Sequence, residues 1–548
     1  MKTARDQRDT ARWTIAAGLA ISACCALGAH AVTVYVDDTG NNSNSGLTTG
    51  AAWKTIQHAV NSVSPGDEIV VLPGLYAGAR IESSGTSNAP ITLRAAAGAD
   101  VWITAPGANN RHNSNLELEV WDGDWVVRHW IVEGLKITNA PAWGIDARST
   151  QHITIRSNTV IDSGVTGIFT AFCYDITIEG NISHHNGEHG IYHNNSSDRF
   201  VIRGNRCYDN ANAGIHMNGD LSNPVPAGAP WTLDGLISHG LIEDNLIYNN
   251  GPGGAAINMD GVTYTMVRNN VLVLSYNNSG IALFQQNGAE PSHNNQILHN
   301  TIGTRSSGGW AINLTQAGCV SNKVYNNIAL TDHSWRGSIM IANPNLVGFE
   351  SDYNIVMDRF SIDGGGTKIT FSQWKALGYD THSIIATPSQ LYLDIWQNFH
   401  LLATAPAVDA GTTLTSVCDD VELRYRPLDS NNNGSSLPDI GAYERLHGSA
   451  DSDGDGILDW VEEYIGINPA DHESVFVVSD VVPGPAPNQV ILKWPSTSGV
   501  LYKVRRSTNV PPSYSTVQNN IPATPPMNCF TTTVVGPIDL FTVIAKTP

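Results

Sequence analysis

The chain has 548 residues, of which 41% are hydrophobic, and it carries 50 acidic side chains against 30 Lys and Arg, a net charge of −20. This length allows more than one domain. The acidic excess argues against nucleic acids and anionic membrane surfaces as partners. A polyanionic ligand would also be repelled, unless a bound cation or a local basic patch compensates.

The first 31 residues have the pattern of a secretory signal peptide. Four basic residues precede an apolar run from Ile15 to Leu27, and Ala29-His30-Ala31 is a small-x-small cleavage site. That run is too short to span a membrane permanently. Ile21-Ser22-Ala23-Cys24 also resembles a lipobox, so a lipoprotein anchored through Cys24 is the alternative. We therefore expect a secreted or cell-surface protein with no membrane span; residues 32–548 hold 26 basic and 48 acidic side chains, a net −22.

The cysteines do not predict a disulfide framework. Five lie outside the signal peptide, an odd number at wide spacing. We expect them to be buried thiols: Cys173, Cys207, Cys319, Cys418 and Cys529.

An internal repeat dominates the middle of the chain. A small residue followed by Ile recurs at steps of 23, 23, 24, 42, 24 and 31 residues, ending at Ile145, Ile168, Ile191, Ile215, Ile257, Ile281 and Ile312. In phase with it, a run of alternating apolar residues ends in Asn158, Asn181, Asn205, Asn245, Asn270, Asn300 and Asn327. Each segment has the length and composition of a strand, and turn residues separate the segments.

Coils of about 23 residues with two or three short strands predict an all-β fold, a right-handed parallel β-helix over residues 32–446. One coil cannot bury its apolar face alone, so stacked coils must share a continuous core. The repeated asparagines are then structural, because their side chains can hydrogen-bond from coil to coil.

Strand alternation assigns the outward-facing columns. In the Asn-ending strand the column is predicted to be a solvated salt-bridge ladder: Lys136, Arg156, Glu179, Arg203, Glu243, Arg268, His299, Tyr325. The small-Ile strand gives a first column of Asp146, Phe169, Tyr192, His216, Asn258, Ala282, Asn313. Its second column is Arg148, Ala171, Asn194, Asn218, Asp260, Phe284, Thr315.

Both ends of the predicted helix resemble known caps. Tyr35–Tyr76, with a short helix from Trp53 to Val63 and a Pro65-Gly66-Asp67 turn, resembles the N-terminal cap of pectate-lyase-like β-helices, notably polysaccharide lyase family nine. Asp439–Glu444 resembles the closing phrase of such helices in bacterial surface proteins. This resemblance implies a polysaccharide as partner, and we expect a monomer.

A calcium loop is predicted in residues 449–473. Positions 1, 3, 5, 6, 9 and 12 of the calcium template match Asp451, Asp453, Asp455, Gly456, Asp459 and Glu462. With Gly466–Asp471 the segment resembles thrombospondin-type-3 repeats, which implies structural calcium. Residues 475–548 resemble a small fibronectin-type-III-like β-sandwich with Trp494 and Tyr502 as core aromatics.

The resemblance to pectate-lyase-like helices implies a substrate groove on the small-Ile strands. Histidines beside Tyr and Asp suit proton transfer, and the catalytic candidates are Tyr192, His216, Asp220, Asp260, Glu188 and His189. Substrate-binding candidates are Arg148, Asn194, Asn218, Asn258 and Trp231. His193 falls on an inward position. No spacing such as HxH or HExxH predicts a catalytic metal.

The 42-residue step between Ile215 and Ile257 predicts an extra loop of about 18 residues that contains Trp231. A loop with one aromatic side chain could wall the groove and stack on a sugar ring. An ordinary insertion in a solenoid is the alternative.

One departure from family nine is informative. Its pectate lyases use an outward lysine as base beside a calcium-binding carboxylate cluster, but this face has no lysine, and Arg148 alone is basic.

Three functions stay open. The first is a lyase that removes the proton α to a uronate carboxylate, with Tyr192 and His216 as base and acid. The second is an inverting hydrolase using Asp220 and Asp260, and the third is a non-catalytic glycan-binding solenoid.

Overall fold

A computed structural model describes residues 31–119, 126–222, 231, 233–273, 278–394, 398–448, 452–453, 459, 462, 467–471, 478, 480–485, 488–496, 501–508, 515–525, 527–535 and 540–546. The expected signal peptide lies outside this range. No helix in the described part of the chain is long and apolar enough to cross a membrane.

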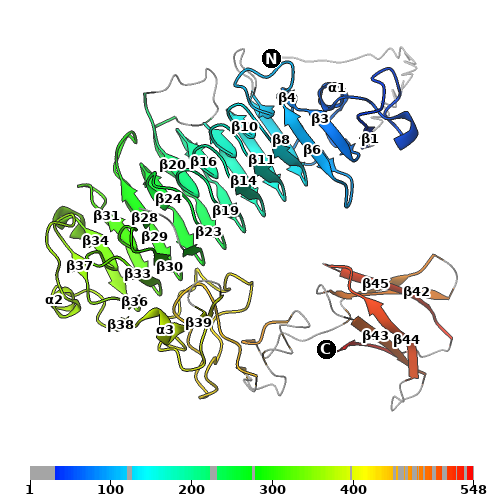
Figure 1. Cartoon of the computed structure of the whole chain (residues 1–548). Coiled ribbons are helices and arrows are strands. Elements are labelled where there is room, and N and C mark those ends of the chain that lie inside the picture. Colours follow the sequence, from blue (N-terminus) through cyan, green and yellow to red (C-terminus); the bar gives the residue numbers. More distant parts are fainter. Residues whose placement is uncertain are drawn as a thin grey trace, which may run out of the picture.

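Three long parallel sheets run side by side along one axis and form the predicted parallel β-helix (Figure 1). Sheet A contains β1 (Thr33–Val36), β2 (Glu68–Val71), β5 (Ile91–Ala95), β8 (Val127–Glu133), β11 (Thr150–Arg156), β14 (Tyr174–Glu179), β18 (Val201–Arg203), β22 (Leu241–Glu243), β26 (Met266–Arg268), β29 (Gln296–Leu298), β32 (Lys323–Tyr325) and β35 (Glu350–Asp352). A short side ladder of β17 (Ser197–Asp198), β21 (Ile237–Ser238) and β25 (Val262–Thr263) joins it.

Sheet B contains β3 (Gly74–Ala77), β6 (Val101–Ala105), β9 (Lys136–Thr138), β12 (Thr159–Ile161), β15 (Ile182–His184), β19 (Arg206–Tyr208), β23 (Leu246–Tyr248), β27 (Val271–Val273), β30 (Thr301–Thr304), β33 (Ile328–Thr331), β36 (Ile355–Val356) and β38 (Ile384–Ile385). Sheet C contains β4 (Ala79–Ile81), β7 (Leu116–Leu118), β10 (Ile145–Arg148), β13 (Ile168–Ala171), β16 (Ile191–Asn194), β20 (Ile215–Asn218), β24 (Ala255–Asp260), β28 (Ser279–Phe284), β31 (Ile312–Leu314), β34 (Ile339–Ile341) and β37 (Phe360–Ser361).

The small residue of the repeat is explained by a close approach of successive coils. A Cβ atom on Gly167 would lie 2.1 Å from Ser183 Oγ and 2.8 Å from the Gly190 carbonyl oxygen. The isoleucine that follows, Ile168, is fully buried and pairs with Ile145 and Ile191 of the neighbouring coils. The repeat therefore sets both the tight turn and the inner column of the core.

The predicted asparagine ladder is confirmed. Asn245 shows the pattern: its Nδ2 donates to Asn270 Oδ1 (2.9 Å) and to the Ile202 carbonyl (2.9 Å), while its Oδ1 accepts from Asn205. The same side-chain contact links Asn158, Asn181, Asn205, Asn245, Asn270, Asn300, Asn327 and Asn354. Because each amide is buried and paired on both sides, the ladder fixes the coil register.

The predicted salt-bridge ladder on sheet A is confirmed from Arg156 to Arg268, with ion pairs such as Arg203–Glu179 at 2.8 Å. Two members of the predicted column were wrong, whereas Tyr325 at its end is confirmed. Lys136 lies past the turn in sheet B, and Glu133 takes its place. Leu298 replaces His299, which follows β29 in a left-handed conformation (φ 52°) and is buried.

The N-terminal end of the core carries the predicted short helix, α1 (Ile56–Ser62), after the 3-10 turn η1 (Thr49–Ala51). The Thr55 hydroxyl caps it by accepting from the His58 amide, and Ile56 and Val60 are buried in the main core. Further along lie η2 (Asn343–Leu346), α2 (Phe371–Ala376), α3 (Pro388–Leu391) and the hairpin β39 (Tyr392–Asp394)–β40 (Asn398–Leu401).

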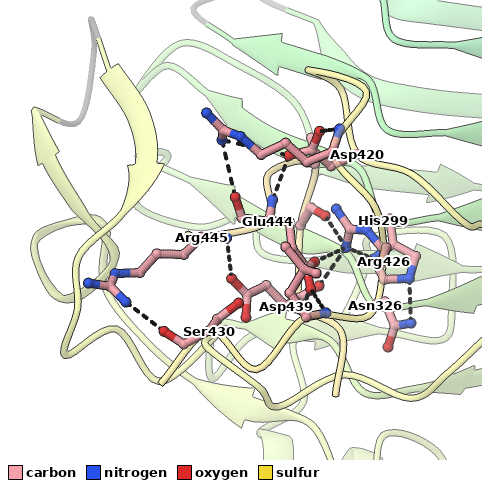
Figure 2. A network of polar contacts seen from close by, with 12 residues as sticks. His299, Asn326, Asp420, Arg426, Ser430, Asp439, Glu444 and Arg445 are labelled. Atoms are coloured by element: carbon pink, nitrogen blue, oxygen red, sulfur yellow. Dashed lines mark hydrogen bonds and ion pairs between the residues drawn. The ribbon is translucent and has the colours of Figure 1, made fainter. Parts of the chain in front are cut away.

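Residues 402–447, which we call the strap, pack on the β-helix through a second hydrophobic core and a buried polar network (Figure 2). The Arg426 guanidinium contacts His299 Nδ1, donates to the Asp439 carbonyl (2.7 Å) and lies 3.4 Å from Glu444 Oε2. Glu444 and Asp439 are fully buried. The predicted closing phrase is therefore part of the strap that seals this network.

The C-terminal region has two small antiparallel sheets. One contains β41 (Asp480–Pro483), β42 (Gln489–Pro495) and β45 (Met527–Thr533), and the other β43 (Leu501–Ser507), β44 (Ser515–Pro522) and β46 (Leu540–Lys546). Trp494 and Tyr502, one from each sheet, are fully buried with their ring centroids 5.6 Å apart. They form the shared core that the sequence predicted; the fibronectin-type-III likeness stays a prediction.

Candidate functional site

The two predicted columns on sheet C are confirmed by the strand register. Tyr192 pairs with His216 and His216 with Asn258, while Asn194 pairs with Asn218 and Asn218 with Asp260. Each step from coil to coil is about 4.8 Å. The polar side chains of the middle coils therefore line one face of the helix, and we call the strip formed by the two columns the groove face.

An aromatic cluster of three titratable residues lies at the centre of the groove face. His189 and His216 stack with their ring centroids 4.4 Å apart, and Tyr192 meets them edge-on at 5.2 and 4.7 Å. His189 comes from the turn before β16, so the coil turn and two adjacent strands supply the three rings. The sequence predicted all three as catalytic candidates, and the structure brings them together.

Hydrogen bonds fix the tautomer of both imidazoles. The Ala213 amide donates to His189 Nδ1 (3.1 Å), and Asn258 Nδ2 donates to His216 Nδ1 (2.8 Å). Each neutral ring therefore carries its hydrogen on Nε2. Burial lowers the pKa of His189 to about 3, with repulsion from His216 adding to it, and lowers the pKa of His216 to about 4. Both rings are thus neutral N–H donors at neutral pH.

Tyr192 is the third member of the cluster. Asn218 Nδ2 donates to its phenol oxygen (3.2 Å), and burial raises the pKa of Tyr192 to about 12, with Glu188, Asp220 and Asp260 adding to the rise. The phenol is neutral at neutral pH, but its oxygen already accepts the amide hydrogen that would stabilise a phenolate.

The predicted carboxylates have different surroundings. Asp260 is almost fully buried, and its two oxygens accept from the backbone amides of Gln286, Asn287 and Gly288 at 2.7–3.2 Å. Asp220 Oδ1 accepts from the backbone and hydroxyl of Ser222. Both carboxylates are thus engaged in holding loops beside the groove face. Glu188 is partly exposed in the turn before His189.

Trp231 and its loop lie differently from the prediction. The Trp231 ring stacks on Tyr174 of β14 in sheet A (5.5 Å), while Leu233 packs against the cluster of Phe169, Ala171 and Phe172. The described end of the loop therefore borders the groove face through Leu233. Pro224, Pro226 and Pro230 lie outside the described residues.

Other histidines close by in the sequence lie away from this cluster. His184 belongs to sheet B, where it stacks on Tyr208 (4.6 Å), and His239 stacks on Tyr264 beside the side ladder of sheet A. His193 is fully buried, as predicted, with Nδ1 2.7 Å from Thr170 Oγ1, and burial lowers its pKa to about 3.

Arg148 lies at one end of the groove face. Its Nε donates to both carboxylate oxygens of the buried Asp146 (2.9 and 3.1 Å), and its guanidinium carbon lies 4.7 Å from the centre of the Trp143 ring and 4.5 Å from that of Phe169. Burial raises the pKa of Asp146 to about 6, although Arg148 opposes the shift. Asp146 and Tyr192 lie two coil steps apart, with the coil of Phe169 between them, so Arg148 is not adjacent to the aromatic cluster.

Three residues one coil before Arg148 were not predicted from the sequence. His112 Nε2 lies 2.7 Å from Glu119 Oε2, and Glu117 pairs in register with Asp146. Ligand atoms of His112, Glu117 and Glu119 lie within 4.8 Å of one another, so this group could hold a metal ion. The alternation Leu116-Glu117-Leu118-Glu119 was the available signal, but this coil lacks the small-Ile phrase that marked the others.

The predicted calcium loop is described only in part. Asp459 is buried and accepts from the Ser452 amide (2.7 Å) and hydroxyl (2.8 Å), and Glu462 is fully buried. Asp453 is described as well, whereas Asp451 and Asp455 lie outside the described residues. An all-oxygen donor set of this kind suits calcium.

Comparisons with known proteins agree on the fold. The family model "Right handed beta helix region" matches residues 108–226. Mannuronan C5-epimerase AlgE2 of Azotobacter vinelandii is 26% identical over 157 residues, and AlgE5 of the same organism 27% over 158; each match covers 27% of this chain. The chain spans only 15% of the length of these relatives.

Among solved structures, that of pectate lyase Pel9A is 17% identical, with a TM-score of 0.50, and the match covers 75% of this chain and 96% of that one. At this identity the likeness concerns the fold. Together with the family match, it establishes the chain as a right-handed parallel β-helix with the architecture seen in Pel9A.

Proposed function

We propose that this protein is a secreted polysaccharide lyase whose groove face binds a uronate-containing glycan and removes the proton α to a carboxylate. The observation that carries the proposal is the cluster of Tyr192, His189 and His216 on successive coils. The names of the relatives, which act on mannuronan or pectate, support a uronate substrate.

The geometry gives each residue a role. The Nε2–H groups of His189 and His216 donate to the substrate carboxylate, as neutral imidazoles can, and the amides of Asn194 and Asn258 add donors. These hydrogen bonds to the carboxylate withdraw electron density from C5, the carbon that loses its proton. Tyr192, as tyrosinate stabilised by Asn218, takes the C5 proton. The C5–H electrons form the C4–C5 double bond, the C4–O bond breaks, and the new phenol hydrogen passes to the leaving oxygen.

The hydrolase alternative has less support. An inverting hydrolase needs one carboxylic acid and one carboxylate facing the bond, with a water between. Asp260 has both oxygens occupied by loop amides, and Asp220 has Oδ1 occupied by Ser222.

A second candidate is a C5-epimerase, which the matches to mannuronan C5-epimerases favour. It begins with the same proton abstraction but returns a proton to the opposite face of C5 instead of expelling the C4 oxygen. Purified protein should be incubated with polymannuronate, polyguluronate and polygalacturonate. Ultraviolet absorbance of the new double bond marks a lyase, altered residue composition without chain shortening marks an epimerase, and reducing ends without absorbance would refute both.

His216 should be essential for the reaction. His216→Ala removes an Nε2–H donor to the carboxylate, and we expect kcat/KM to fall at least about 100-fold. His239→Ala is the matched control, because His239 stacks on Tyr264 away from the groove face, and it should leave kcat/KM unchanged. Equal losses in both variants would mean that the site lies on another face.

We further propose that the loop around Asp453, Asp459 and Glu462 binds structural calcium. EDTA should lower the melting temperature of the C-terminal region and leave the β-helix transition largely in place. Asp455→Ala should reproduce the effect of EDTA, because it removes one oxygen ligand. Differential scanning calorimetry tests this; unchanged unfolding under both treatments would exclude a calcium site there.

A further inference from the structure

The end of the groove face near β10 presents a fixed guanidinium beside an aromatic ring. Arg148 is held by Asp146 through Nε and is sandwiched against Trp143 and Phe169. Asp146 engages only Nε; Nη2 is buried and has no hydrogen-bond acceptor among the described residues, while the side chain as a whole is 20% exposed. Trp143 itself is partly exposed.

The charges in this region are arranged in layers. The side chains of Arg148 and His112 are 20% and 22% exposed, whereas those of Asp146, Glu117 and Glu119 are 0%, 0% and 4% exposed. Each buried carboxylate is paired with one basic side chain: Asp146 with Arg148, Glu117 with Arg80 at 3.4 Å, and Glu119 with His112. A ligand that approaches the described part of this surface therefore meets the Arg148 and His112 side chains before the carboxylates.

His112 is the second ring beside Arg148. Its Nε2 lies 2.7 Å from Glu119 Oε2, which holds the imidazole in place. The ring lies edge-on to Trp143, with centroids 6.2 Å apart. The guanidinium, the imidazole and the indole thus share one small area. This combination suits an acidic sugar, because a carboxylate pairs with Arg and a sugar ring packs on Trp.

We propose that Arg148, His112 and Trp143 form a subsite for the carboxylate of a second uronate, two sugars away from the residue that reacts at Tyr192. The inference rests on the proposed function for the position of the reacting sugar. Asp146, Phe169 and Tyr192 are successive members of one column, two steps or roughly 10 Å apart in all. One pyranose unit is about as long as one coil step, so a glycan along the axis presents one sugar to each coil. The preferred substrate then carries a second uronate two sugars away from the uronate that reacts.

The test is equilibrium binding, which separates the subsite from catalysis. Trisaccharides of mannuronate, guluronate and galacturonate, and the same trisaccharides after carboxyl reduction, are titrated calorimetrically into Tyr192→Phe protein. The Tyr192→Phe protein should bind an acidic trisaccharide at least 10-fold more tightly than the carboxyl-reduced form of the same trisaccharide. Adding Arg148→Gln to this variant should weaken its affinity for the acidic trisaccharide about 10- to 100-fold, the range for a charged hydrogen bond. Its affinity for the carboxyl-reduced trisaccharide should not change.

Two further variants make the result decisive. Arg148→Lys keeps the charge without the paired N–H geometry and should give an intermediate affinity. Arg203→Gln removes an equally charged side chain from sheet A and should change nothing. Acidic binding that is the same with and without Arg148, in variants with unchanged melting temperature, would overturn the subsite. Arg148-dependent binding by a protein that modifies no uronate polymer would uphold the subsite while rejecting the proposed function.

Discussion

Replacing Tyr192 by Phe should reduce kcat/KM by about 1000-fold, within the range for loss of a general acid or base. The substitution removes one oxygen and the hydrogen bond from Asn218, and it keeps the ring that packs edge-on against His216. The melting temperature should therefore hardly change. Tyr208→Phe is the matched control, because Tyr208 stacks between His184 and Tyr248 on sheet B.

The same assignment has a consequence for pH dependence. Burial raises the pKa of Tyr192 to about 12, so the reactive tyrosinate is a small fraction that grows tenfold with each pH unit below that value. The logarithm of kcat/KM should accordingly rise with a slope near one across neutral and mildly alkaline pH. A flat profile over this range would contradict Tyr192 as the base.

The second large effect concerns stability. Arg426→Met should lower the free energy of unfolding by about 3–5 kcal/mol at neutral pH, because it leaves the buried carboxylates Glu444 and Asp439 without their cation. Arg203→Met is the control: its ion pair with Glu179 is half exposed, and the expected loss is below about 1 kcal/mol. Chemical denaturation of both variants measures the difference.

The Arg426 effect should depend on pH in a defined direction. Burial raises the pKa of Asp439 to about 7 and that of Glu444 well above its ordinary value, so both groups bind protons more tightly in the folded than in the unfolded chain. Ionising them therefore costs stability as pH rises from about 4, the unfolded value, through their folded pKa. The Arg426→Met loss should be small near pH 5 and should grow as the pH rises through 7. A loss independent of pH would mean that Arg426 stabilises the strap by packing alone.

The sequence predicted those parts of the fold that repeat. Coil-to-coil stacking enforces the repeat period, the inward isoleucines, the asparagine ladder and the two columns of the groove face. Each of these residues could therefore be predicted from the equivalent residues in neighbouring coils. Prediction failed at the turns. A turn at Gly134 moved Lys136 to another sheet. His299 occupies the left-handed turn position just before Asn300, so that Leu298 takes its place in the column, and the strap covers it. Whether a side chain is free to react also escaped prediction, because the loop amides that bind Asp260 come from residues 286–288.

The asparagine ladder has a consequence for how such a protein can change. Each buried amide faces its equivalents in the coils before and after it, so one residue added within a strand would break two side-chain pairings at once. The 42-residue coil keeps Asn205 and Asn245 paired although it is far longer than its neighbours, since the extra length lies wholly between β20 and β21. Natural or laboratory insertions at that turn can thus remodel the border of the groove face near Leu233, while the stacked coils keep their alignment.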